Sequence, residues 1–170
     1  MNRFKIRKIA LSGIFVAIAV VGSLFSFPVF GSRCAPVQHV VNILSAVMLG
    51  PWYGVVIAFI SSVIRLMTGL GSPLAFPGSM FGALLSGLMY YKFRKMPVAV
   101  IFEVIGTAIL GGLCAYPVAI LVMGKSAGEL AFYAYVIPFL ISTAGGSVLA
   151  SLILVALSKT GMIKKFNGDK

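Results

Sequence analysis

One short polar stretch stands out in an otherwise apolar chain and carries side chains suited to chemistry. Residues 31–51 contain the only histidine, His39, with Gln38 beside it and Asn42 three residues further on. Positions three and four apart on a helix return to one face, so these side chains are expected to lie together. An imidazole and two carboxamides supply hydrogen-bond donors and acceptors. The stretch therefore predicts the wall of a small-molecule pocket, the alternative being a hydrogen-bonded histidine between helices.

A single carboxylate, Glu103, lies deep in an apolar segment. Carboxylates inside a membrane are costly and usually face the interior of the protein together with a partner. We expect Glu103 to join a buried polar network or a structural ion pair with Arg65. Arg65 either closes the pocket or reaches the membrane interface. Ser142 and Thr143 add hydroxyl groups within reach of a ligand.

No motif for catalysis or nucleotide binding accompanies these residues. The sequence contains no nucleotide-binding loop and no HExxH, GxSxG or CxxC pattern, and its two cysteines, Cys34 and Cys114, are far apart. We therefore predict a binding protein that is not an enzyme and holds neither a metal nor a cofactor. Any ATP-driven step is expected to come from another chain.

The composition places the chain in a lipid bilayer. Of its 170 residues, 60% are hydrophobic and only 10% are charged, and its mean hydropathy is +1.08. Soluble domains carry about 25% charged residues. The net charge of +11 does not indicate nucleic-acid binding, because the basic residues cluster where helices are expected to end.

The apolar runs predict one all-α domain, a bundle of six transmembrane helices, spanning residues 1–170. Glycine, proline and basic residues punctuate the runs. A loop at residues 33–36 is expected to be exposed, and Pro117 is expected to kink the fifth helix. The expected helices cover residues 7–27, 37–50, 53–68, 77–91, 97–123 and 131–157.

The distribution of positive charge predicts the orientation. Of the 14 Lys and Arg residues, all but Arg33, Arg65 and Lys125 fall on one side of the six predicted spans. Cytoplasmic loops are enriched in Lys and Arg, so both termini are expected in the cytoplasm of a cell-membrane protein. The polar loops near residues 31–42, 69–79 and 124–129 then form one outer mouth. Glu103 is expected lower down, toward the inner side.

The first helix offers a surface for another helix. Gly13 and Ala17 are four residues apart and therefore share a face, where small side chains allow close approach. They are expected either to pack inside the bundle or to dock onto a partner membrane protein.

The order of several short motifs resembles the ThiW family, which belongs to the substrate-binding S components of energy-coupling factor (ECF) transporters. The resemblance covers nearly the whole chain and departs at Ser12-Gly13, where many S components have two alanines. The motifs, besides Asn42, are Cys34–His39 (CAPVQH), Leu49–Tyr53 (LGPWY), Gly71–Met80 (GSPLAFPGSM), Glu103–Thr107 (EVIGT) and Ala115–Ala119 (AYPVA).

This resemblance implies uptake of hydroxyethylthiazole, the thiazole precursor of thiamine. An S component captures its ligand outside, docks on a transmembrane scaffold subunit served by two ATPases, and releases the ligand inward. The face with Gly13 and Ala17 would dock. We hypothesise that Phe76 and Tyr116 sandwich the ring, while the polar residues named above bind its nitrogen or hydroxyl. The expected substrate-binding set is Gln38, His39, Asn42, Phe76, Glu103, Tyr116 and Thr143.

Other functions remain open at this point. The ligand is alternatively another precursor, such as hydroxymethylpyrimidine, or thiamine itself, whose positive charge favours a carboxylate in the pocket. A structural membrane subunit without a ligand and a self-sufficient transporter are alternatives from other classes. An intramembrane enzyme fits least, because no catalytic constellation is evident.

Overall fold

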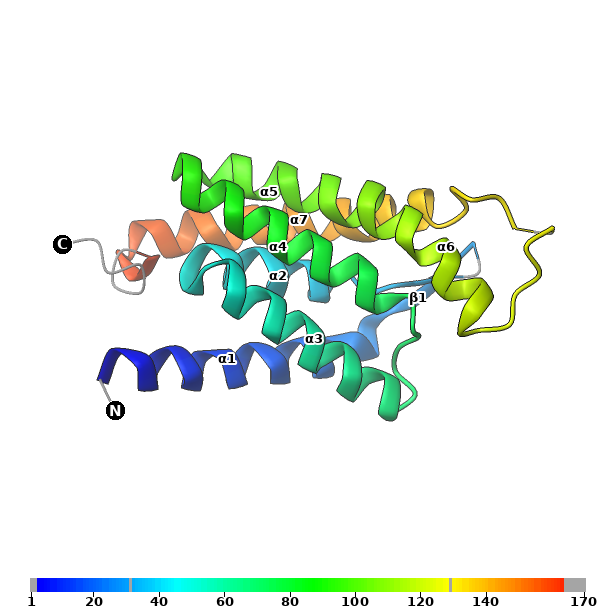
Figure 1. Ribbon diagram of the computed structural model, residues 1–170. Coiled ribbons are helices and arrows are strands. Elements are labelled where there is room, and N and C mark those ends of the chain that lie inside the picture. The colour runs from blue at the N-terminus through cyan, green and yellow to red at the C-terminus, as the bar shows by residue number, and fades with distance from the viewer. Residues whose placement is uncertain (1–2, 31, 129, 164–170) are drawn as a thin grey trace.

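The computed structural model describes residues 3–30, 32–128 and 130–163 of the chain. Its elements (Figure 1) are α1 (Arg3–Gly22), η1 (Ser23–Phe25), β1 (Phe27–Val29), β2 (Ser32–Cys34), α2 (Pro36–Leu49), α3 (Pro51–Met67), α4 (Ala75–Phe93), α5 (Met96–Ile105), the π-helical η2 (Gly106–Gly111), α6 (Gly112–Leu121) and α7 (Val136–Lys159). Gly31, Glu129, Lys164, Lys165 and Lys170, on which part of the predicted topology rests, lie outside the described residues.

Helix α2 is the centre of the bundle. Every residue from Gln38 to Leu49 is buried, and α2 packs against α1, α3, α4 and α7. A helix that is apolar almost all round is stable only when other helices surround it. It begins at Pro36, in the first turn where proline is tolerated, and ends at Leu49. The next residue is Gly50, whose φ of +96° suits glycine.

The long fifth helix is continuous from α5 through η2 to α6, but its middle is π-helical. Two glycines bracket this segment and lie against α4. A Cβ on Gly106 would stand 2.6 Å from the carbonyl oxygen of Phe81, and one on Gly111 would stand 2.6 Å from Cα of Gly78. The widened turn therefore occurs where two backbones nearly touch. Pro117 lies within α6, after the π-helical segment.

The segment after α1 differs from the exposed loop that the sequence predicts. It forms an antiparallel hairpin in which Phe27 faces Cys34 and Val29 faces Ser32. Ser32 and Cys34 are buried, and only Arg33 is exposed. The predicted loop is wrong here, because side chains that alternate along a strand can face the protein and the solvent in turn. The first helix ends at Gly22, before the predicted residue 27, and the last helix begins at Val136, after the predicted residue 131.

The helices turn a broad apolar surface outward. Among the described residues, three segments are long and apolar enough to cross a membrane, Lys5–Phe25, Met96–Leu121 and Val136–Lys159, and α2 and α3 are shorter apolar helices. Large apolar side chains on α1, α5 and α7 are exposed. A surface of this kind is stable only against lipid or a partner. The number of spans and the side of each terminus stay predictions.

Candidate functional site

A polar cavity is lined in part by the hairpin and the start of α2. The hairpin lies at the end of the bundle away from the start of α1 and the end of α7 (Figure 1). The space open to the centre of a water molecule is about 40 Å³, within a recess of about 430 Å³ that includes its open mouth. One water needs roughly 10–15 Å³ on the first of these scales. The lining comes from β2, α2, α3, α4, η2, α7 and the segment before α4. Its polar residues are Ser32, Arg33, Gln38, His39, Arg65, Ser72, Ser79, Thr107 and Ser142.

Gln38 and His39 reach the cavity because they occupy the first turns of α2, immediately after the hairpin. Both line the cavity and both are otherwise buried. Two contacts hold this segment to α7: the backbone N–H of Ala35 donates to Ser142 Oγ at 2.9 Å, and the Cys34 thiol donates to the carbonyl oxygen of Pro138 at 3.3 Å. The hairpin therefore positions the start of α2 against the last helix.

His39 is held from both sides of its ring. Its Nδ1 lies 2.8 Å from Glu103 Oε1, and its Nε2 lies 3.0 Å from Ser142 Oγ. Since Ser142 already accepts the N–H of Ala35, its hydroxyl is free to donate to Nε2, and Nδ1–H then donates to the carboxylate. This assignment gives a hydrogen-bond partner to Ser142, to both ring nitrogens of His39 and to Glu103, and it fixes the orientation of the imidazole.

Glu103 is the buried anchor of the network rather than part of the cavity wall. It is completely buried, and besides His39 its oxygens accept from Thr107 at 3.0 Å, from Asn42 at 3.5 Å and from the Thr143 hydroxyl. Asn42, Glu103 and Thr143 lie behind the lining residues. The five polar side chains predicted to bind ligand, apart from Tyr116, thus separate into Gln38 and His39, which face the cavity, and three that support them.

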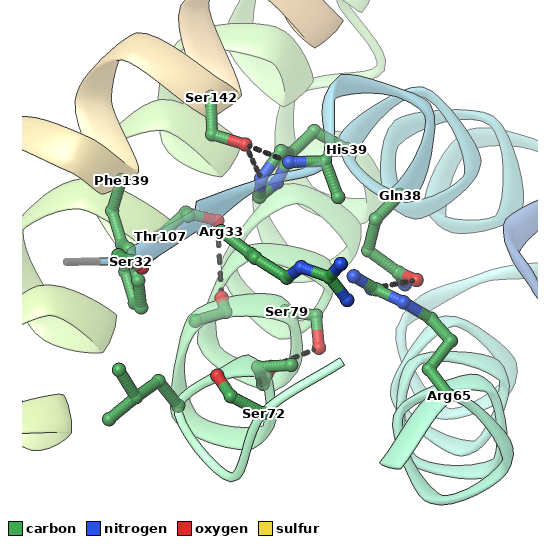
Figure 2. Close-up of a pocket in the computed structure, with 14 residues that line it drawn as sticks. Ser32, Arg33, Gln38, His39, Arg65, Ser72, Ser79, Thr107, Phe139 and Ser142 are labelled. Atoms are coloured by element: carbon green, nitrogen blue, oxygen red, sulfur yellow. Dashed lines mark hydrogen bonds between the residues drawn. The ribbon is translucent and has the colours of Figure 1, made fainter. Parts of the chain in front are cut away.

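A second chain of hydrogen bonds leads from this network to Arg65. Asn42 donates to the carbonyl oxygen of Ser79 at 3.2 Å and accepts from Gln38 Nε2 at 3.0 Å. Gln38 Oε1 in turn accepts from Arg65 Nη1 at 3.1 Å and from the Ser61 hydroxyl at 3.3 Å. Arg65 therefore turns inward to Gln38, as Figure 2 shows, and does not reach for the interface. The pairing with Glu103 considered from the sequence does not occur, because His39 holds that carboxylate.

Glycines make this close arrangement possible. A Cβ on Gly146 of α7 would lie 2.7 Å from Cβ of His39. One on Gly82 of α4 would lie 2.9 Å from Glu103 Oε1. Gly82 is thus limited to glycine by the polar groups of the network, and Gly146 by the close approach of the start of α2.

The two aromatic residues expected to sandwich a ring are not brought together. Phe76 packs edge-on against Phe59 with ring centroids 5.7 Å apart, and the Tyr116 hydroxyl points to the carbonyl oxygen of Ala127 at 3.5 Å. Neither lines the cavity, whereas Phe139 of α7 does. Nothing in the sequence separates Phe139 from the other phenylalanines, because a phenyl ring in an apolar helix is typical of membrane surfaces as well as of pockets.

Arg33 is exposed and lines the mouth of the cavity, as its place in the polar stretch predicts, but it belongs to the strand β2 and not to a loop. Thr107 was not singled out, although it lies one helical turn after Glu103 and bonds to it. That spacing is a signal the sequence did contain.

The order hydroxyl, imidazole, carboxylate in Ser142, His39 and Glu103 is also that of hydrolase triads. Such catalysis needs donors for an oxyanion in addition to the triad. The backbone N–H that the structure places against Ser142, that of Ala35, bonds to the hydroxyl itself. In this structure the arrangement fastens the hairpin and α2 to α7 and presents a fixed imidazole to the cavity.

The two small residues of α1 lie outside the bundle core. Gly13 and Ala17 are both exposed, and a Cβ on Gly13 would meet nothing within 4 Å. The alternative in which they serve internal packing does not apply to this structure.

Comparison with known proteins identifies one family. Residues 9–160 match the family model described as thiamine-precursor transporter protein (ThiW). No curated protein matches the chain.

Proposed function

Because the chain belongs to the ThiW family of thiamine-precursor transporters, we propose that it is the substrate-capture subunit of an ECF importer. In this proposal it is a multi-pass protein of the cell membrane with both termini in the cytoplasm. It takes hydroxyethylthiazole from outside and delivers it through a scaffold subunit and two ATPases. The family match itself establishes only a membrane transporter for a thiamine precursor.

The observation that carries the proposal is the cavity at the hairpin end. It combines an oriented imidazole, a carboxamide and hydroxyl groups with the ring of Phe139. Pockets for small ligands are typically apolar, with a few fixed polar groups that orient the ligand. A flat heteroaromatic ring with a short polar tail suits such a lining.

The charges of the lining favour a thiazole over thiamine. Arg33 and Arg65 both line the cavity, and none of the lining residues is a carboxylate. The one carboxylate among the described residues, Glu103, lies behind His39 and is occupied by it. A cationic ligand such as thiamine would meet two guanidinium groups without a compensating anion.

The test is ligand titration of the purified full-length protein by calorimetry. We expect saturable binding of hydroxyethylthiazole and no comparable binding of thiamine or hydroxymethylpyrimidine. His39→Ala and Ser142→Ala should each weaken binding about two- to tenfold, because a typical hydrogen bond contributes roughly 0.5–1.5 kcal/mol. Ser158→Ala is the matched control, since that hydroxyl is exposed and bonds only within its own helix.

Two results would contradict the proposal. Wild-type affinity in both His39→Ala and Ser142→Ala would remove the cavity as the site. Exclusive binding of thiamine or the pyrimidine would keep a vitamin-capture role and reject the thiazole.

A further inference from the structure

Two arginines face the same cavity from different elements. Arg33 comes from the hairpin and Arg65 from the last turn of α3. Figure 2 shows their guanidinium groups pointing toward one another beside Gln38. They lie close enough for the charge of one to act on the other. Like charges so placed repel unless an anion lies between them.

The protein provides little to offset these charges. Arg65 is 3% exposed, its Nη1 bonds to the neutral Gln38, and its Nε has no hydrogen-bond partner. Arg33 Nη1 donates to the carbonyl oxygen of Gly69 at 3.0 Å, again a neutral group. Neither arginine has an acidic partner among the described residues, where Glu103 is the one carboxylate.

A buried guanidinium without an anionic partner is unfavourable. Its position beside a cavity therefore points to an anionic partner that comes from outside the chain. Guanidinium forks match the paired oxygens of carboxylates and phosphates in geometry as well as in charge. Ser32 and Ser72 add hydroxyl groups to the same lining. Such a set is typical of a site for an oxyanion.

We propose that Arg33 and Arg65 form an anion subsite beside the ring site, so that a thiazole carrying a phosphate or carboxylate group binds more tightly than the neutral alcohol. This inference rests on the proposed function for the ring and adds the charge of the ligand. Figure 2 places Phe139 and Arg65 on opposite sides of the cavity. The ring would pack near Phe139 and His39, and the anionic group would accept hydrogen bonds from Arg65 Nε and the Arg33 guanidinium.

The test compares four ligands on the full-length protein at low salt: hydroxyethylthiazole, its phosphate monoester, a thiazole carboxylate, and inorganic phosphate. At least one anionic thiazole should bind about tenfold or more tightly than the neutral alcohol, because losing one partner of a buried charge pair typically costs at least that factor. The stronger of the two anions identifies the group.

Variants locate the effect. Arg33→Gln and Arg65→Gln should each reduce the preference for the anion, measured as the ratio of the two affinities in the same variant, to about twofold or less, since a hydrogen bond to a charged group is lost only for the anion. Arg33 is exposed, so its variant tests the proposal even where Arg65→Gln fails to fold. Lys125→Gln removes an exposed charge outside the cavity and should keep the full preference.

The outcomes separate the two proposals. Tighter binding of the neutral alcohol than of both anions overturns the anion subsite and leaves the thiazole function in place. Saturable phosphate binding that Arg33→Gln abolishes, without binding of any thiazole, supports the subsite and rejects the thiazole function. An anion preference that survives in both arginine variants, or no binding of any of the four, overturns the subsite.

Discussion

Glu103 decides whether the polar side chains around it are satisfied. His39, Asn42, Thr107 and Thr143 all donate to its two oxygens in a fully buried position. A buried donor that loses its acceptor costs about 1–3 kcal/mol. The residue therefore supports the cavity from behind by holding His39 in place.

We expect Glu103→Ala to lower the melting temperature of the detergent-purified protein by several degrees and to weaken ligand binding, because several donors lose their acceptor at once. Glu103→Gln, which keeps the shape and one carbonyl acceptor, should lie between Ala and wild type. Scanning fluorimetry measures the shift, with Ser158→Ala as control. An unchanged melting temperature in Glu103→Ala would show that the network contributes no stability.

Part of this network was evident from the residues themselves. The spacing of Gln38, His39 and Asn42 predicts a shared helical face, and the structure places Gln38 and His39 at the cavity with Asn42 behind them. The predicted topology places Glu103 lower in the membrane, which argues against a direct contact with the ligand. Its link to His39 joins residues 64 positions apart, and no local pattern specifies which distant partner a buried carboxylate meets.

At the scale of the helices, the approach of α7 to α2 depends on one of two adjacent glycines. A Cβ at Gly146 would collide with the carbonyl oxygen of Pro36 and Cβ of His39, whereas one at Gly145 would meet only Pro36 side-chain atoms at 3.9 Å. The two positions thus make a matched pair with the same chemical change.

Gly146→Ala is expected to separate α7 from the start of α2 and to break the contact between Ser142 and His39, lowering both the melting temperature and ligand affinity. The cost should be about 1–3 kcal/mol, as for other overpacked interiors. Gly145→Ala should behave like wild type or slightly better, since alanine favours a helix. Equal behaviour of the two variants in fluorimetry and calorimetry would contradict this packing.

The hairpin and the π-helical segment are two elements that the hydrophobic pattern of the sequence does not predict. Hydrophobic runs predict helices well when the solvent is lipid, because every backbone N–H and C=O group must then be hydrogen-bonded within the protein. The strands at Phe27–Val29 and Ser32–Cys34 are too short for a periodic signal. The π-helical turn at Gly106–Gly111 lies where the helix touches α4, and the sequence of α5 and α6 alone does not specify that contact.

For the molecule as a whole, the exposed face of α1 is the surface that we propose for docking onto a partner membrane protein. Gly13 and Ala17 lie there with Ile14 and Ile18, both about half exposed. Small residues between larger ones allow a second helix to approach closely within a membrane. This surface lies on a different helix from those that line the cavity, so docking and ligand binding can be tested separately.

We expect Gly13→Leu and Ala17→Leu to prevent copurification with the scaffold and ATPase subunits while leaving ligand affinity and melting temperature of the isolated protein unchanged. The isolated protein should be insensitive, because a Cβ on Gly13 would meet nothing within 4 Å and Ala17 is exposed. Val148→Leu, on the exposed surface of α7, is the control. Intact assembly in both α1 variants would place the docking surface elsewhere.

The sequence alone determined the membrane class, the family and the polar stretch that lines the cavity. The composition of a chain indicates whether water or lipid surrounds it. The type of a residue such as His39 determines which hydrogen bonds it can form. Only the tertiary structure decided that His39 pairs with Glu103, that Phe139 rather than Phe76 or Tyr116 reaches the cavity, and that Arg33 and Arg65 face each other there. These are contacts between distant segments, and they depend on how helices pack around α2 rather than on the local pattern of any one of them.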